Sequence, residues 1–305
     1  MYGRQLEYLA ALDRERHFAR AADACHVTQP TLSAGIQALE TALGVPLVRR
    51  GRRFEAITPE GELVLRWAHR IVADCEHLAT DVARLRGELV GVLRIGAIPT
   101  AQAAIALLTS PFLERHPLMR IEVRSLTSRE IERDLHTYKL DVGLTYLSNE
   151  PLQNMRTWPV YHERYLLLSR LDGPFTGRST VAWRELADVP LCLLTPDNQN
   201  RRIINGLFRQ AGIAPPRPSV ETNSLSTLLG HVRSGWASVM AHPWLATFGV
   251  PEHMHALPLV DPEATHVVGL IAPDQDPMPP LATALSQVTR TLNVDAELDK
   301  HPTPP

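Results

Sequence analysis

Residues 18–43 of the chain read FARAADACHVTQPTLSAGIQALETAL, and this stretch contains two short amphipathic patterns joined by a tight turn. Apolar residues recur at helical spacing in both patterns, first at Phe18, Ala21, Ala22 and Cys25, and then at Leu32, Ile36, Leu39 and Leu43. Thr28 is a candidate N-cap for the second helix, and Pro30 falls in its first turn, where the missing N–H leaves no hydrogen bond unmade. The stretch predicts a helix-turn-helix, although a helical hairpin that only packs would show the same apolar spacing.

The face of the second helix opposite its leucine stripe is short and polar. This face carries Pro30, Ser33, Ala34, Gln37 and Thr41, with Thr28 and Gln29 at the helix start. A glutamine side chain pairs with adenine through two hydrogen bonds, and serine or threonine bonds to any base. Surface helices built only for solubility usually carry Lys–Glu pairs instead. The face therefore favours a DNA-reading helix over a packed hairpin.

Any DNA binding by this chain must come from a local basic patch, because the net charge of the 305 residues is only −2. Four arginines follow the second helix within five residues: Arg49, Arg50, Arg52 and Arg53. A run of this kind is often a solvated loop. Its place directly after the candidate recognition helix favours a hairpin wing that lies over DNA phosphates.

A long helix is expected to begin after Thr58, with Pro59 in its first turn. Apolar residues then recur in steps of four and three, at Val64, Ala68, Ile71, Cys75, Leu78, Val82, Leu85 and Leu89. A heptad pattern of this length predicts a coiled-coil seam, and hence a dimer through residues 59–90. The alternative is a helix that lies on its own domain.

From Val92 onward, strand-like and helix-like segments alternate, which predicts an α/β fold with mostly parallel sheets. The expected strands are residues 92–97, 121–126, 141–146, 164–169, 191–195, 219–222, 237–240 and 267–272, and the expected helices are 100–115, 128–138, 200–211, 225–234 and 280–292. The chain is accordingly divided into a DNA-binding domain (1–58), a linker helix (59–90) and an effector domain (91–305). In the effector domain, 91–162 and 267–305 form one subdomain and 163–266 the other.

Several of the expected strands end in small polar clusters followed by a helix. These candidate effector residues are Thr100, Ala101, Gln102, Thr127, Ser128, Tyr146, Thr195, Asn198, Asn200 and Asn223. Each cluster alone reads as an ordinary N-cap, but their recurrence at strand ends favours a ligand cleft between the subdomains. Because helix N-termini favour anions, a small carboxylate or other oxyanion is the expected ligand, with Arg201 and His242 as candidate sources of charge.

The sequence gives no sign of catalysis or of a bound cofactor. It contains no nucleophile elbow, phosphate-binding loop or zinc-protease motif, and its three cysteines (Cys25, Cys75 and Cys192) are too widely spaced for a metal motif. We therefore expect no metal, no cofactor and no enzyme activity. A disulfide switch within the effector domain would need a second cysteine beside Cys192. The absence of a long apolar run and of a signal peptide predicts a cytoplasmic protein without membrane contact.

The stretches FARAADACHVTQPTLSAGIQALETALGVPLVRR and ITPEGELVL resemble the N-terminal signature of the LysR-type transcriptional regulators. The resemblance implies an all-α winged helix-turn-helix, a linker helix and an effector domain of two doubly wound α/β subdomains, like a type 2 periplasmic binding protein. It implies DNA contacts for the recognition-helix positions Thr28, Gln29, Pro30, Ser33 and Gln37 and for the wing at 50–53. It places an effector near Thr100, the Thr127–Ser128 turn, Tyr146 and the 195–200 loop. Ala34 departs from the family, which often has a basic or polar residue there.

The expected partners are double-stranded DNA, a small-molecule effector and other copies of this chain. Two recognition helices related by two-fold symmetry predict a pseudo-palindromic operator. The family resemblance implies a homotetramer, and RNA polymerase is a further candidate partner. Two other classes share the C-terminal architecture: a solute-binding protein, which has no use for the first 90 residues, and an enzyme on the same fold.

Overall fold

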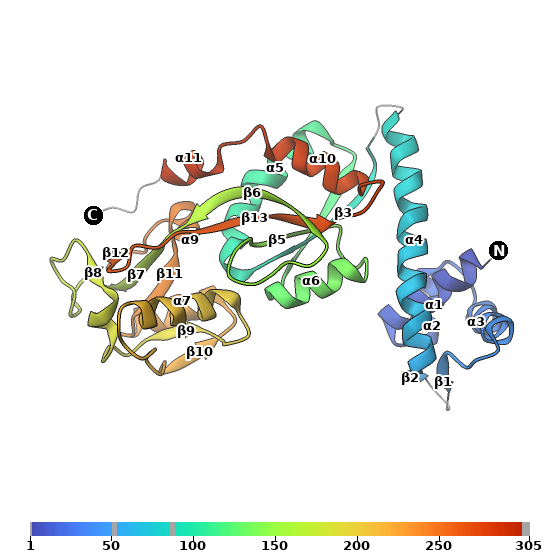
Figure 1. Ribbon diagram of the computed structural model, residues 1–305, viewed down its shortest axis with the longest axis horizontal. Helices are drawn as coiled ribbons and strands as arrows, with labels where there is room; N and C mark the ends of the chain where they lie inside the picture. Colours follow the sequence, from blue (N-terminus) through green and yellow to red (C-terminus); the bar gives the residue numbers. More distant parts are fainter. Residues whose placement is uncertain (1, 51–53, 86–88, 301–305) are drawn as a thin grey trace. The chain divides into compact units, whose positions relative to one another are not determined.

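The computed structural model describes residues 2–50, 54–85 and 89–300, and the chain divides into two compact units at 88/89. The first unit is helical with one small hairpin, and the second is α/β (Figure 1). Each unit has its own apolar core.

The N-terminal unit begins with a helix that the sequence reading did not predict, α1 (Gly3–Glu15). It packs against α2 (Phe18–Ala24), α3 (Gln29–Leu43) and the start of the long helix α4 (Pro59–Leu85). Tyr8 of α1 lies so close to Gly35 of α3 that a Cβ there would come within 2.6 Å of the ring, so this crossing requires glycine. The helix-turn-helix pair α2–α3 thus packs with α1 and the start of α4 in one helical core.

The two apolar stripes of the helix pair face that core as expected, with one exception. Ala21 and Ala22 of α2 and Leu32, Ile36 and Leu39 of α3 are buried. Leu43 is exposed, contrary to its predicted place on the stripe, because α3 ends there and Gly44 turns the chain away in the left-handed conformation.

Helix α4 is capped by Thr58, whose hydroxyl accepts the Gly61 N–H at 2.9 Å. The predicted coiled-coil seam, which runs from Val64 to Leu89, is buried in its first part and exposed further along α4. Ala68 is buried in the core of its own unit with Val64 packed beside it, whereas Ile71, Leu78 and Val82 further along are exposed. Leu89, the last predicted seam position, does not belong to the helix and is buried in the core of the second unit.

The C-terminal unit contains two principal sheets, each belonging to one subdomain. The first has the order β4-β3-β5-β13-β6, and its strands are Met119–Ser125, Gly91–Ala97, Val142–Tyr146, His266–Pro273 and Met155–Glu163. The second has the order β11-β7-β12-β8, and its strands are Ser238–Ala241, Tyr165–Arg170, Met254–Val260 and Val181–Ala182. A parallel pair, β9 (Cys192–Leu194) and β10 (Val220–Thr222), joins this subdomain.

The expectation of mostly parallel sheets was wrong. Strands β3, β4 and β5 run parallel, but β13 is antiparallel to both β5 and β6, and β7 is antiparallel to β11 and β12. The antiparallel pairings come from strands next to the two passages of the chain between the subdomains, from β6 to β7 and from β12 to β13.

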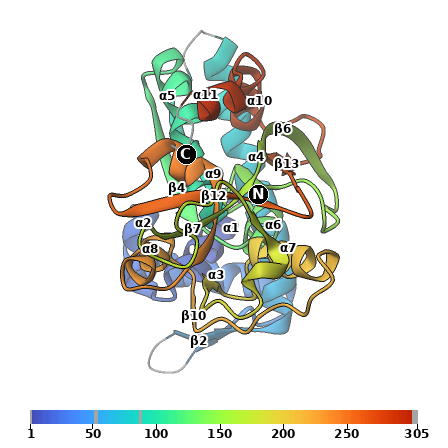
Figure 2. The same ribbon diagram turned by 90° about the vertical axis from the view of Figure 1, so that its left-hand side faces the viewer.

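Helices cover the sheets of both subdomains (Figure 1, Figure 2). They are η1 (Pro99–Ala104), α5 (Ile105–Arg115), α6 (Ser128–His136), η2 (Trp183–Leu186), α7 (Gln199–Gln210), α8 (Leu225–Arg233), α9 (His242–Phe248), α10 (Pro280–Thr289) and α11 (Val294–Asp299). The predicted helix 100–115 is therefore a 3₁₀ turn followed by a shorter α-helix. Helices η1, α6, α7 and α8 follow the ends of β3, β4, β9 and β10, and residues at or just before all four helix starts line one pocket between the subdomains.

Candidate nucleic-acid interface and effector pocket

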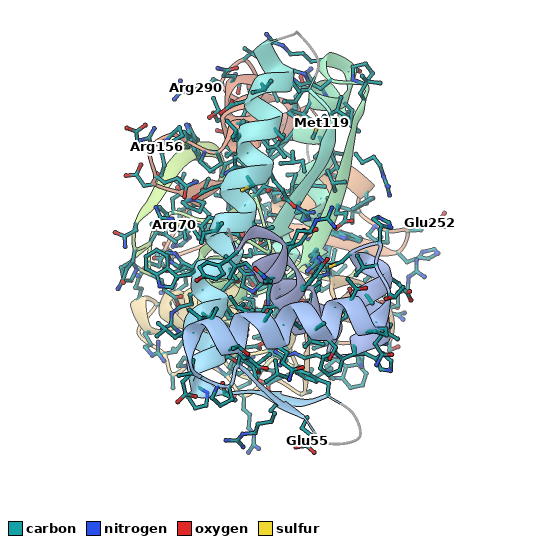
Figure 3. The ribbon with its side chains drawn as sticks, turned by 90° about the vertical axis from the view of Figure 1, so that its right-hand side faces the viewer. Glu55, Arg70, Met119, Arg156, Glu252 and Arg290 are labelled. Atoms are coloured by element: carbon teal, nitrogen blue, oxygen red, sulfur yellow. The ribbon has the colours of Figure 1, made fainter. Side chains whose placement is uncertain are left out.

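The start of α3 presents a capped and exposed polar surface. The Thr28 hydroxyl accepts the Thr31 N–H at 3.4 Å and lies 2.8 Å from the Thr31 hydroxyl, which fixes the first turn. Gln29, Pro30 and Gln37 are exposed, and Ser33 is half-buried. Figure 3 views this unit with α3 across the front and Glu55 marking the hairpin beside it.

The hairpin of β1 (Val48–Arg50) and β2 (Phe54–Ile57) is anchored directly to α3. The Glu40 carboxylate of α3 accepts the N–H groups of Leu47 and Val48 at 2.9 and 3.1 Å. Arg49 is exposed on β1, and Arg50 ends that strand. Arg52 and Arg53 lie outside the described residues. A carboxylate thus fixes a basic strand against the helix that presents Gln29.

A pocket of about 630 Å³ lies between the two subdomains. Its lining residues are Pro99, Gln102, Ala103, Ser125, Leu126, Thr127 and Glu130 from the first subdomain, and Asp197, Asn198, Asn223, Ser224, Leu225, Ser226, Trp244 and Phe248 from the second. Among the predicted effector residues, Gln102, Thr127, Asn198 and Asn223 line this pocket. The polar helix starts of both subdomains therefore converge on one space, which we call the cleft pocket.

Three other predicted residues, Thr100, Tyr146 and Asn200, form a buried network that does not line the cleft pocket. The Asn200 amide donates to the Tyr146 hydroxyl at 3.0 Å, and the Thr100 hydroxyl lies 3.3 Å from the same oxygen. Tyr146 in turn donates a short hydrogen bond to the carboxyl group of Glu163. Asn200 belongs to α7 and Tyr146 to β5, so this network connects the two subdomains.

Glu163, which sequence reasoning missed, is the only ionisable acid in this network, and it is fully buried. Burial raises the pKa of its carboxyl group from 4.5 to about 7, while hydrogen bonds, above all from Tyr146, act in the opposite direction. Among the described residues, one carboxyl oxygen of Glu163 and the hydroxyl of Tyr161 form no hydrogen bond of normal geometry. The residue ends β6 at the passage between the subdomains, where no sequence motif distinguishes it.

The remaining predicted residues are placed away from the pocket. Ala101 is buried in the core, and Ser128 is buried with no hydrogen-bond partner for its hydroxyl in the part of the chain that the structure describes. The Thr195 hydroxyl accepts the Asn198 amide at 2.9 Å and so orients a lining residue.

The described lining of the cleft pocket contains no arginine, lysine or histidine. Its charged groups are the carboxylates of Glu130 and Asp197, and its aromatic wall is Trp244 and Phe248, whose ring centroids lie 5.3 Å apart. Arg201, a candidate source of charge, is buried and bonded to the Leu194 carbonyl and the Glu221 carboxylate at 2.9 and 2.8 Å. The pocket thus lacks the cation that the sequence reading assigned to it.

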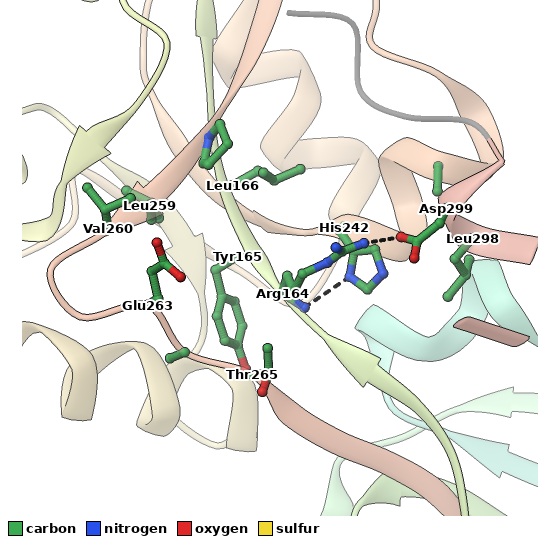
Figure 4. Close-up of a pocket in the computed structure, with 13 residues that line it drawn as sticks. Arg164, Tyr165, Leu166, His242, Leu259, Val260, Glu263, Thr265, Leu298 and Asp299 are labelled. Carbon is green, nitrogen blue, oxygen red and sulfur yellow. Dashed lines mark hydrogen bonds and ion pairs between the residues drawn. The ribbon is translucent and has the colours of Figure 1, made fainter. Parts of the chain in front are cut away.

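His242, the other candidate source of charge, lines a second pocket of about 420 Å³ (Figure 4). The backbone N–H of Arg164 donates to His242 Nδ1 at 2.9 Å, and the Arg164 guanidinium forms an ion pair with Asp299 of α11. Burial lowers the pKa of His242 from 6.5 to about 4, so the ring is neutral at physiological pH. We call this space the hinge pocket, because Arg164 lies between β6 and β7 and Thr265 lies between β12 and β13.

Cys192 is the only cysteine after Cys75 in the sequence, and it is fully buried in β9. Its thiol contacts the carbonyl oxygens of Leu228 and Ala237 at 3.6 and 3.5 Å. Burial raises its pKa from 9.0 to about 11, so the thiolate is scarcely populated near neutral pH.

Within the described parts of the chain, no group of histidine, cysteine and acidic side chains is arranged to hold a metal ion. Among the same residues, no helix has the length and apolar character needed to cross a membrane.

Comparisons with known proteins agree with this architecture. Residues 3–62 match the model of the bacterial regulatory helix-turn-helix protein, lysR family, and residues 86–292 match that of the LysR substrate binding domain. The DNA-binding transcriptional dual regulator OxyR of Escherichia coli K12 is 31% identical over 303 residues, which cover 97% of each chain. A hydrogen peroxide-inducible genes activator of Pectobacterium carotovorum is 32% identical over 275 residues, covering 88% of this chain and 89% of its own.

Solved structures with the same fold include full-length OxyR from Pseudomonas aeruginosa, in a cysteine variant, with a TM-score of 0.79, 26% identity and 96% coverage of both chains. CbnR in complex with its target DNA has a TM-score of 0.69 and 24% identity, and the match covers 95% of this chain and 99% of that one. The residues matched by the two family models span both units. The chain belongs to the LysR family of DNA-binding transcriptional regulators.

Proposed function

We propose that this regulator reads operator DNA with the start of α3 and holds it with the β1–β2 hairpin. The observation that carries the proposal is the exposed polar surface of α3, fixed by the Thr28 cap and joined to a basic strand through Glu40. Gln29 and Gln37 are the proposed base-reading side chains, because an amide can donate to and accept from one adenine. Arg49 is the proposed phosphate contact among the described arginines.

We further propose that two copies of the chain associate through α4. Its exposed apolar residues share one face of the helix, and they are Leu63, Trp67, Ile71, Leu78 and Val82. A helix packed only on its own domain would not leave an apolar stripe of this length in water. The dimer brings two α3 helices to one operator, and its two-fold symmetry predicts paired half-sites in the DNA.

The cleft pocket is the proposed effector site. Its lining comes from both subdomains, so a ligand held there would favour one relative orientation of the two. Amide and hydroxyl groups line it together with Trp244 and Phe248, which suits a ligand with an apolar ring and hydrogen-bonding groups. A carboxylate effector stays a prediction without a basic side chain to support it in this pocket.

We do not infer peroxide sensing for this chain from the relatives that are named as peroxide-inducible activators. A disulfide within the C-terminal unit requires two cysteines, and this chain has only Cys192 there. Its buried thiol and raised pKa make Cys192 a poor nucleophile as well. We propose that reversible ligand binding, and not cysteine oxidation or enzymatic turnover, sets the state of this regulator. Because it acts on operator DNA, we place it in the cytoplasm.

The test has a DNA arm and a ligand arm. Selection of binding sites from a random duplex library by the full chain should enrich two related half-sites with inverted symmetry. A thermal-shift screen of metabolites should then identify a compound that stabilises the protein by mass action. Its stabilisation should fall in Asn223→Ala, which changes the cleft pocket, and persist in Gln210→Ala, an exposed position at the end of α7. Enrichment of no symmetric site would overturn the DNA proposal, and equal loss in both variants would overturn the pocket assignment.

A further inference from the structure

The hinge pocket is formed by both connections between the two subdomains. Arg164 is the single residue between β6 and β7, and Glu263 and Thr265 belong to the passage between β12 and β13. It is distinct from the cleft pocket, since the two share no lining residue. With a volume of about 420 Å³, it falls in the usual range for small-ligand sites, roughly 300–1,000 Å³.

We propose that the hinge pocket is a second ligand site, and that it takes a small amphipathic carboxylate whose charged end pairs with Arg164. This proposal goes beyond the effector site proposed above and does not depend on DNA binding.

The polar end of the pocket offers two hydrogen-bond donors of suitable kind. The Arg164 guanidinium is about half exposed and therefore accessible to a ligand. Because His242 Nδ1 accepts the Arg164 N–H, the neutral ring carries its proton on Nε2. The structure gives Nε2 no partner among the described residues, although His242 is only 5% exposed. A carboxylate bound here would gain a guanidinium and the N–H donor of the His242 ring.

The rest of the pocket suits an apolar body. Its apolar lining is Leu166, Ala246, Pro258, Leu259, Val260, Ala264 and Leu298. In Figure 4, Glu263 lies near Val260 and Leu259, on the side of Arg164 away from Asp299, so an anionic group would be repelled there. The charges of the pocket therefore fix the orientation of the ligand, with its carboxylate toward Arg164 and its apolar chain toward Leu259.

The Arg164 guanidinium already forms an ion pair with Asp299, so a ligand carboxylate must compete with the Asp299 carboxylate for it. Both side chains of this ion pair are about half exposed, at 51% and 55%. Exposed pairs contribute little to stability because water and salt screen them. A ligand that replaces Asp299 leaves that carboxylate in water and keeps Arg164 paired, while it adds apolar contact. Removal of the Asp299 charge should consequently strengthen ligand binding, an effect that damage to the fold cannot imitate.

The test uses the full chain with hexanoate and its uncharged isostere hexanamide, measured by isothermal titration calorimetry. The unchanged protein should bind hexanoate at least about fivefold more tightly than hexanamide, as expected for a charge-assisted contact. Arg164→Met keeps the apolar stem and should abolish this preference. Asp299→Asn should bind hexanoate up to about fivefold more tightly than the unchanged protein, the limit set by an exposed ion pair.

Glu297→Gln is the matched control, because it removes one negative charge from the same helix without touching Arg164. It should leave hexanoate affinity as it is. Equal affinity for hexanoate and hexanamide, an unchanged preference in Arg164→Met, or equal tightening in Asp299→Asn and Glu297→Gln would each overturn the proposal. So would the absence of hexanoate binding to both the unchanged protein and Asp299→Asn. DNA binding is not part of this readout, so its loss would refute the proposed function alone.

Discussion

Replacement of Glu163 by glutamine should stabilise the second unit strongly at pH 8 and by less than about 1 kcal/mol at pH 5. The carboxyl group is buried, and its pKa rises from 4.5 to about 7 on folding. Below pH 4.5 it is neutral in both states, and above about pH 7 it is ionised in both. Between these values only the unfolded chain releases the proton, so stability falls as pH rises through this window.

The magnitude follows from the same two values. One unit of pKa difference corresponds to about 1.4 kcal/mol, so the ionisation of Glu163 removes about 3 kcal/mol from the free energy of unfolding. Glutamine has the shape of the neutral acid and does not ionise. The variant should therefore gain about 3 kcal/mol over the unchanged protein at pH 8, and most of this gain should develop between pH 5 and pH 7.

Other groups titrate in the same window and must be separated from Glu163. The pKa of His242 falls from 6.5 to about 4 on folding, so between these values only the unfolded chain binds the proton and stability falls as pH falls. Its effect opposes that of Glu163 in the unchanged protein, so the absolute pH profile is not diagnostic. The difference between Glu163→Gln and the unchanged protein cancels His242, because both proteins contain it.

Urea unfolding followed by tryptophan fluorescence is a suitable assay, because Trp67 is the only tryptophan before Trp158. The signal consequently reports mainly on the second unit. Glu122→Gln, at an exposed position on β4, is the control and should show no pH-dependent gain. A stability difference for Glu163→Gln that is the same at pH 5 and pH 8 would refute the reasoning.

Four shorter predictions concern the other sites. Gln29→Ala should relax base preference at one position of each half-site by about 1–3 kcal/mol, measured by competition between operator variants; an unchanged preference would remove Gln29 from base reading. Arg49→Ala should weaken binding to all sequences alike and reduce the salt dependence by about one phosphate contact, whereas a sequence-selective loss would contradict that role. Leu78→Glu on the exposed stripe of α4 should dissociate the dimer in size-exclusion chromatography, while Thr80→Glu on another face should not. Hydrogen peroxide should leave the Cys192 thiol intact in mass spectrometry of the folded protein, and oxidation at stoichiometric peroxide would contradict its burial.

The sequence predicted elements well where a local periodic pattern and the tertiary packing agree. The stripe of α3 met both conditions, and its predicted residues are buried up to Leu39. Strand β6 met neither, because Pro159 and several polar residues interrupt any alternation. The structure accommodates Pro159 at an irregularity in the pairing of β6 with β13, where the ladder does not require its missing N–H.

The candidate site was predictable in part for a related reason. Polar clusters at strand ends located the cleft pocket through Gln102, Thr127 and Asn198, since those positions follow from the order of strands and helices. The charge of the cleft pocket could not be predicted from the sequence, because the long side chain of an arginine pairs with whichever acceptor the fold brings near it. Arg201 illustrates this, since it turns to Glu221 on a neighbouring strand. Glu163 was missed because burial of a lone acid leaves no periodic trace.

The two passages between the subdomains differ in length, and this difference limits how the subdomains can move. Glu163 ends β6 and Tyr165 begins β7, so a single residue separates these strands, whereas residues 261–265 separate β12 from β13. A joint one residue long acts nearly as a fixed point, and together with the second connection it defines an axis. We therefore expect a hinge swing about that axis, rather than sliding, to be the main motion between the subdomains. The response to a bound ligand should thus be measurable as a change in the angle between the two subdomains, with its pivot at Arg164.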